Sequence, residues 1–133
     1  MNLPGTRVLV VGMGLSGQAA ARLALSRGAT VTCTDLRDDA PSVPGCAAVY
    51  GSHRLEDFLQ ADLIVASPGV PPSIEPLRKA AAHGVEIVGE LGFAARGLKV
   101  PVVAITGTNG KSSTTWFTAQ LLEQAGFRPF VGG

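Results

Sequence analysis

The sequence predicts an α/β fold, in which a parallel sheet carries helices on both of its faces. Short β-branched runs alternate with helical stretches along the chain, and strands that alternate with helices pair in parallel through right-handed crossovers. Hydrophobic residues make up 46% of the 133 residues and charged residues 16%, against a usual charged share of about 25%. Such a chain has enough apolar surface to bury a core, which excludes a disordered protein.

In the first expected unit, residues 1–96, strands alternate with helices, except that a polar, proline-bearing loop at Arg37–Gly45 separates the second and third strands. Its first strand ends at a glycine turn, and the helix that follows carries apolar residues at helical spacing until Gly28 stops it. Ser73 can cap the third helix, with Glu75 in its first turn. The expected strands are Arg7–Val11, Thr30–Thr34, Ala47–Tyr50, Asp62–Ala66 and Glu86–Val88, and the expected helices are Leu15–Arg27, Arg54–Gln60, Ser73–Gly84 and Glu90–Arg96.

The second expected unit, residues 97–133, is the start of a further α/β domain. A stretch of this length forms roughly one βαβ unit, which is too little to cover both faces of its own strand. We therefore expect the chain to be the N-terminal part of a longer protein. The expected elements are a linker at Gly97–Lys99, a strand at Val100–Thr106, a glycine turn at Gly107–Gly110, a helix at Ser112–Gln124 and a strand that starts at Phe130–Val131.

The charge balance and the cysteines narrow the class of protein. Eleven Lys and Arg residues against ten Asp and Glu residues leave a net charge of +1, which gives no electrostatic footprint for nonspecific nucleic-acid binding. The apolar runs are far shorter than the roughly 18 residues of a membrane span, and no signal peptide is evident.

Cys33 lies in an apolar run, so we expect a buried free thiol and a reducing cytoplasm. His53 and His83 have no partner at metal or triad spacing, and we expect both at the surface.

A glycine turn after the first strand matches the GxGxxG pattern. Gly12 allows the tight turn, Gly14 lets a phosphate approach the backbone, and Gly17 lets helix and strand pack closely. The helix N-terminus offers unpaired N–H groups and the positive end of a dipole. Asp35 ends the second strand 18 residues after Gly17, where a carboxylate can accept hydrogen bonds from a hydroxylated ring. The glycines alone could merely shape a strand–helix corner, but the combination favours a nucleotide-type ligand and leaves its kind open.

Two further features fall at the carboxyl edge of the expected sheet, where ligands bind in open parallel sheets. Arg37 follows Asp35 by two residues and either reaches a phosphate or carboxylate or stays solvated in a loop. Ser67, Pro68 and Gly69 follow the fourth strand. A ligand contact and an ordinary turn explain this second feature equally well.

A second glycine turn, Thr106 to Ser113, precedes the last expected helix and is similar to a phosphate-binding P-loop. The strict pattern GxxxxGK[ST] fails because Ile105 stands at the position of its first glycine. Consecutive backbone N–H groups can still form a nest for phosphate oxygens. Lys111 would place its charge on the β- and γ-phosphates, and the Ser112 hydroxyl would bind Mg²⁺. A lysine in the first helical turn opposes the helix dipole, so a phosphate partner explains it better than an ordinary helix start.

The nucleotide-type domain followed by the string TGTNGKS resembles the Mur ligases of peptidoglycan synthesis, and among them the branch that adds D-glutamate. The resemblance covers essentially the whole chain, and TGTNGKS is its most specific part. It implies a Rossmann-like parallel-sheet domain followed by the truncated start of a P-loop ATPase-type α/β domain. The strings that carry the resemblance are Gly12 to Gly17, Asp35 to Arg37, Asp62 to Gly69, Glu86 to Glu90 and Ala104 to Ser112.

The resemblance also implies substrates, cofactors and site residues. In that family the first domain binds the UDP of a UDP-muramoyl substrate, and the enzyme joins D-glutamate to this substrate through an acyl phosphate, with ATP and Mg²⁺. A cytoplasmic monomer with small-molecule substrates and no nucleic-acid or membrane partner is expected. Position by position, Leu15 and Ser16 would line the uracil and diphosphate site, Asp35 and Arg37 would hold the uracil end, and Gly69 would lie beside the ligand. The ATP phosphates would be held by Asn109, Gly110, Lys111, Ser112 and Ser113, with Lys111 as a catalytic residue and Ser112 as a ligand of Mg²⁺.

Two departures from the family pattern and two alternative functions remain at this point. Ser113 stands where close relatives usually carry threonine. The family's downstream catalytic residues and C-terminal domain are absent, so we expect no ligase activity from this chain alone. One alternative is an NAD- or FAD-binding oxidoreductase domain that uses GxGxxG and Asp35, which has no need of Lys111 and its glycine loop. The other is a regulatory nucleotide-sensing module without chemistry.

Overall fold

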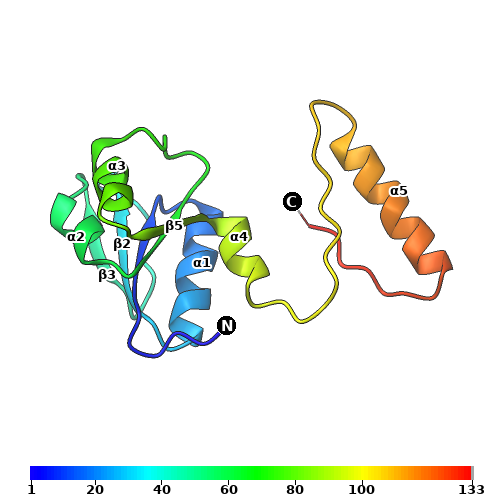
Figure 1. Ribbon diagram of the computed structural model, residues 1–133, viewed down its shortest axis with the longest axis horizontal. Coiled ribbons are helices and arrows are strands. Elements are labelled where there is room, and N and C mark those ends of the chain that lie inside the picture. Colours follow the sequence, from blue (N-terminus) through cyan, green and yellow to red (C-terminus); the bar gives the residue numbers. More distant parts are fainter. Residues whose placement is uncertain (133) are drawn as a thin grey trace. The chain divides into compact units, whose positions relative to one another are not determined.

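The computed structural model describes residues 1–132, which form two compact units, Met1–Leu98 and a second unit from Lys99. The first unit is a five-stranded parallel sheet in the order β3-β2-β1-β4-β5 (Figure 1). The predicted parallel α/β sheet is therefore confirmed. Its strands are β1 (Arg7–Val11), β2 (Thr30–Asp35), β3 (Ala47–Tyr50), β4 (Leu63–Ala66) and β5 (Glu86–Gly89), and its helices are α1 (Leu15–Ser26), α2 (Leu55–Gln60), α3 (Glu75–Ala82) and α4 (Glu90–Ala95).

Strand β1 lies at the centre of the sheet and pairs in parallel with β2 on one side and β4 on the other. In register, Val10 lies opposite Cys33 of β2 and opposite Val65 of β4. The chain builds β1, β2 and β3 outward in one direction and then crosses back to add β4 and β5 on the other side. This order places a topological switch point between β1 and β4, and ligands of open parallel sheets bind at the carboxyl ends of strands beside such a point.

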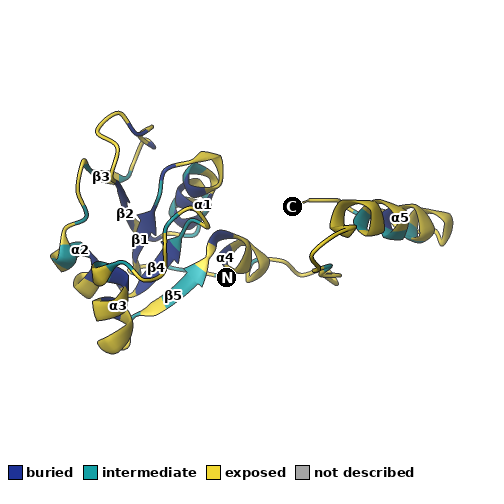
Figure 2. Cartoon of the chain, turned by 90° about the horizontal axis from the view of Figure 1, so that it is seen from above, coloured by how far each residue is buried: buried dark blue, intermediate teal, exposed yellow. Residues whose placement is uncertain are grey.

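Both faces of the sheet are buried, as a parallel sheet requires. Side chains alternate along β1, so Val8 and Val10 pack into one apolar cluster while Leu9 and Val11 pack into the other. Helices α1 and α4 cover the first face, and α2 and α3 cover the second. Figure 2 shows the buried residues concentrated in the strands and on the inner sides of these helices. The first cluster includes Ala20, Ala21, Ala24 and Phe93, and the second includes Phe58, Ile64, Leu77 and Ala80.

The start of α3 differs from the prediction. The helix begins at Glu75 with Ile74 in the N-cap position and no side-chain cap, so the expectation that Ser73 caps it was wrong. Ile74 is still extended, with φ −60° and ψ 143°. Its N–H donates to the carbonyl of Pro71 at 3.2 Å, which closes a turn before the helix starts. The other elements of this unit are where they were expected, within one or two residues at their ends.

The second unit contains the helix α5 (Lys111–Gln124) and no strand among its residues up to 132. The strands expected at Val100–Thr106 and Phe130–Val131 were therefore wrong for this structure. A parallel strand needs paired neighbours and covered faces, and the described part of this unit supplies neither. Val100 and Val103 accordingly remain 65% and 64% exposed.

None of the helices in residues 1–132 combines the length and the apolar character needed to cross a membrane.

Candidate functional site

A cavity of about 340 Å³ opens at the carboxyl ends of the central strands of the first unit. Its walls come from the segments that follow β1, β2 and β4, and from His53 in the loop after β3. A smaller cavity of about 120 Å³ lies toward the amino ends of the strands, where Arg7 and Thr30 line it. Because ligands of open parallel sheets bind at the carboxyl edge, the larger cavity is the candidate site.

The glycine turn after β1 is fixed by close contacts on two sides. Gly12 has φ +92°, and a Cβ there would lie 2.8 Å from the Cβ of Ser67. A Cβ at Gly17 would lie 1.9 Å from the carbonyl oxygen of Gly12, so any larger residue would push α1 away from the strand. The positive φ of Gly12 fits the tight turn expected there, and the contact at Gly17 fits the close packing of helix and strand expected there. Gly14 differs, because a Cβ there would meet nothing within 4 Å, and the space before its backbone is open.

Helix α1 presents an uncapped N-terminus to this space. Gly14 is the N-cap residue, no side chain caps the helix, and its first turn contains no acidic residue. The first N–H groups of a helix have no partner within it, and with the helix dipole they form a site for an anion. Leu15 and Ser16 occupy the first two helical positions and are exposed. Both border the cavity at Gly14 without lining it.

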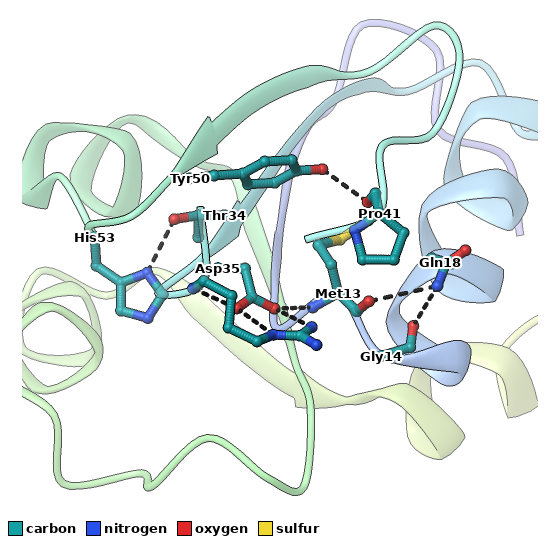
Figure 3. Close-up of polar contacts among 9 residues, drawn as sticks. Met13, Gly14, Gln18, Thr34, Asp35, Pro41, Tyr50 and His53 are labelled. Atoms are coloured by element: carbon teal, nitrogen blue, oxygen red, sulfur yellow. Dashed lines mark hydrogen bonds and ion pairs between the residues drawn. The ribbon is translucent and has the colours of Figure 1, made fainter. Parts of the chain in front are cut away.

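The Asp35 carboxylate accepts four hydrogen bonds at the end of β2 (Figure 3). Its Oδ2 accepts from the Met13 backbone N–H at 2.7 Å and from Arg37 Nη2 at 3.0 Å. Its Oδ1 accepts from the backbone N–H and the Nε of Arg37 at 2.9 and 3.1 Å. A carboxylate has about four acceptor positions, so hydrogen bonds from Met13 and Arg37 occupy all of those of Asp35. These hydrogen bonds connect the turn after β1 to the loop after β2.

The charge state of Asp35 follows from the same contacts. Hydrogen bonds from the Arg37 side chain hold the pKa of the Asp35 carboxyl well below its usual range, while burial of the carboxyl opposes this shift. Asp35 is therefore ionised at neutral pH and balances Arg37. The Arg37 side chain is 57% exposed, against 10% for Asp35, so the arginine is the member of the pair that faces outward into the cavity.

His53 is not the surface residue that the sequence analysis expected. It is half-buried, it lines the cavity, and its Nδ1 lies 2.9 Å from the Oγ1 of Thr34 (Figure 3). Burial lowers its pKa, although the Asp35 carboxylate acts in the opposite direction. The prediction failed because it tested His53 only for metal and triad spacing. The useful signal was its place just after β3, since β3 pairs with β2 and ends at the same sheet edge as Asp35. His83 is exposed, as expected.

Of the residues expected to bind the UDP substrate, the cavity brings together Asp35, Arg37 and Gly69. Leu15 and Ser16 lie at its border. Two residues of the site were not predicted from the sequence: His53, and Met13, whose N–H is the buried donor to Asp35.

The glycine turn of the second unit, taken by itself, leads directly into helix α5. Gly110 is the N-cap of α5 with φ +78°, no side chain caps the helix, and its first turn contains no acidic residue. Asn109, Ser112 and Ser113 are exposed around the turn. The Nζ of Lys111 folds back and donates to the carbonyl of Gly107 at 2.5 Å. The exposed hydroxyls, the lysine and the uncapped helix fit a phosphate with its Mg²⁺. Within residues 1–132, no three or more His, Cys, Asp or Glu side chains gather to hold a metal.

Comparison with protein families bears on one alternative left by the sequence, the oxidoreductase domain. Residues 6–89 match the model of the Mur ligase MurD-like N-terminal domain. The chain belongs to this family. Its five-stranded sheet and the cavity at the carboxyl ends are thus those of a MurD-like domain, and the alternative of an oxidoreductase domain is set aside.

Individual relatives of this MurD-like chain agree with the family. It is 44% identical to the UDP-N-acetylmuramoylalanine–D-glutamate ligase of Geotalea uraniireducens, covering 100% of this chain and 31% of that protein. It is 49% identical to the ligase of the same name from Anaeromyxobacter dehalogenans, covering 98% of this chain and 30% of that protein. Among solved structures, a pseudomurein peptide ligase type C from Methanothermus fervidus matches with a TM-score of 0.61 and 29% identity, covering 92% of this chain and 27% of that one. The chain spans about a third of the length of the curated relatives it matches.

Proposed function

We propose that this chain is the N-terminal portion of a UDP-N-acetylmuramoyl-L-alanine:D-glutamate ligase, a cytoplasmic, ATP-dependent enzyme of peptidoglycan synthesis. One observation carries the proposal: a MurD-like domain has an uncapped helix N-terminus and the Asp35–Arg37 pair at one cavity. The helix suits an anionic group, and the arginine, held by Asp35, suits the carbonyl oxygens of a base. The names of the relatives support the reaction.

Residues 1–96 would bind the UDP part of the sugar nucleotide. The diphosphate would accept hydrogen bonds from the first N–H groups of α1, at Leu15 and Ser16, where Gly14 leaves the space open. Arg37 uses Nε and Nη2 on Asp35, so its Nη1 group can donate to the uracil end. Gly69 would lie beside the ligand from the loop after β4.

Residues 97–133 would begin the ATP-binding domain of P-loop type. The backbone from Asn109 to Ser113 would surround the ATP phosphates, Lys111 would leave its contact with Gly107 to pair with them, and Ser112 would be the Mg²⁺ ligand. The magnesium ion, when bound, neutralises charge on the phosphates. The contribution of these residues to catalysis is positioning and charge neutralisation.

The proposed reaction has two steps. The substrate carboxylate takes the γ-phosphoryl group of ATP to give an acyl phosphate and ADP. The amine of D-glutamate then attacks the acyl carbon, and inorganic phosphate leaves as the amide forms. The partners are small molecules, and the enzyme acts as a monomer.

Calorimetric titration of the chain with UDP, the UDP-sugar substrate, NAD and ATP tests the proposal. We expect UDP and the UDP-sugar to bind in a one-to-one ratio and to compete for one site. Binding of NAD without binding of UDP would contradict the proposal and favour the oxidoreductase alternative.

A further inference from the structure

His53 is held in one orientation by contacts on two sides of its ring. Its Nδ1 lies 2.9 Å from the Oγ1 of Thr34, a fully buried hydroxyl at the end of β2. The ring packs edge-on against Phe58 of α2, with a centroid distance of 5.6 Å and an interplanar angle of 70°. Phe58 is itself completely buried. The imidazole is therefore anchored before any ligand arrives, and its other nitrogen, Nε2, points away from Thr34 (Figure 3).

The hydrogen bonds of Thr34 decide which ring nitrogen carries the proton. A threonine hydroxyl has one proton to donate, and Oγ1 also lies 3.3 Å from the carbonyl oxygen of Ser52, which can only accept. Both contacts are hydrogen bonds when the Thr34 proton goes to Ser52 and the Nδ1–H of His53 donates to Oγ1. In that neutral tautomer Nε2 is an acceptor.

The other side chains that line the cavity determine what an acceptor at His53 contributes to ligand recognition. Asp35 has no acceptor position left, because Met13 and Arg37 occupy all four. Ser67, another lining side chain that can accept, packs against Gly12. Arg37 contributes only donors, and its Nη1 group is not used on Asp35. The wall thus offers the donors of Arg37 together with an acceptor at His53.

This pattern complements one edge of uracil. That edge carries an N3–H donor between two carbonyl acceptors, whereas cytosine has an acceptor at N3 and an amino donor beside it. We infer that His53 is a specificity residue of this cavity, whose Nε2 accepts the N3–H of uracil and so selects uridine nucleotides over cytidine nucleotides. The inference rests on the proposed binding of a UDP-sugar.

The test compares three probes, UDP, CDP and N3-methyl-UDP, by NMR titration of the 133-residue chain, which also measures weak binding. The native chain should bind UDP about tenfold more tightly than CDP or N3-methyl-UDP, as expected when the acceptor Nε2 of His53 loses its donor. In His53→Ala this preference should fall below about twofold, and in His53→Gln, whose side-chain oxygen can accept, part of it should return. His83→Ala is the matched control at the other histidine and should keep the full preference.

A second readout does not depend on any variant. The chain has two histidines, so long-range nitrogen–proton spectra assign the ring nitrogens directly. We expect the Nδ1–H tautomer at His53 and a shift of its Nε2 signal on addition of UDP. An Nε2–H tautomer, or an undiminished preference for UDP in His53→Ala, would overturn the inference while leaving the proposed function standing. No binding of UDP by the native chain would overturn both.

Discussion

Replacement of Asp35 by asparagine should destabilise the first unit by about 2–4 kcal/mol. An amide has one oxygen, so whichever way it is turned its NH₂ group faces two of the four donors that the carboxylate now satisfies. The buried, charge-assisted bond from Met13 is worth about 1.5–3 kcal/mol. The Arg37 side chain is 57% exposed, so its ion pair adds only about 0.2–1 kcal/mol.

Urea denaturation at pH 7, followed by circular dichroism, measures this loss. In a thermal scan the melting temperature should fall by about 8–32 °C, because 1 kcal/mol corresponds to about 4–8 °C for a domain of 60–100 residues. Asp39→Asn is the matched control, because Asp39 is an exposed carboxylate in the same loop, and it should change the free energy of unfolding by less than about 0.5 kcal/mol. Equal, small effects of the two substitutions would refute the assignment of Asp35 as the residue that joins the two loops.

The dependence of this difference on pH has a definite sign. The folded-state pKa of Asp35 is depressed below the ordinary value of 3.8. A depressed carboxyl pKa contributes stability that is complete above the unfolded-state value and is lost as the pH falls toward the folded-state value. The gap in stability between the native chain and Asp35→Asn should therefore be constant from pH 7 to about pH 5 and shrink below about pH 4.

Three further outcomes are expected. Gly17→Ala should lower the free energy of unfolding by about 3 kcal/mol or more, because its Cβ would lie 1.9 Å from a backbone oxygen. Gly14→Ala has open space around its Cβ, so it should change the free energy of unfolding by less than about 1 kcal/mol and weaken UDP binding about tenfold. Equal stability of the two variants would contradict the close packing of α1 on β1. Cys33 should react with thiol reagents at pH 8 more slowly than Cys46. Burial raises the pKa of the Cys33 thiol to about 12, and it also raises the pKa of Cys46, whose side chain is only partly buried. Equally rapid labelling of both cysteines in the native state would show that the sheet opens at β2. In a full-length ligase that contains this sequence, Lys111→Ala should abolish ATP use and leave binding of the UDP substrate within about twofold of normal; a parallel loss of both would mean that the two sites are not separate.

The strands of the first unit were predictable because their apolar runs are short, regularly spaced and separated by strong turn signals. The same logic failed at Val100–Thr106, whose β-branched run is that of a strand, because a strand also depends on neighbours that the described second unit does not contain. Ser73 was a plausible cap by residue type, but the turn from Pro71 to Ile74 sets the start of α3.

The backbone features of the site were easier to predict from the sequence than the contacts of its side chains. GxGxxG and the position of Asp35 indicated the turn, the helix and the acid correctly. The full use of the carboxylate by Met13 and Arg37 depends on how two loops meet in space, which spacing along the chain does not encode. The contact of His53 with Thr34, on a neighbouring strand, is not encoded by spacing either, although the position of His53 just after β3 indicated the correct sheet edge.

The proposed function requires that the cavity at the carboxyl edge of the first sheet binds UDP. A crystal structure of the chain grown with UDP is the decisive experiment. We expect the diphosphate on the first backbone amides of α1, beside Gly14, and the uracil ring between Arg37 and His53. A diphosphate bound instead at Asn109 to Ser113, with the first cavity empty, would contradict it.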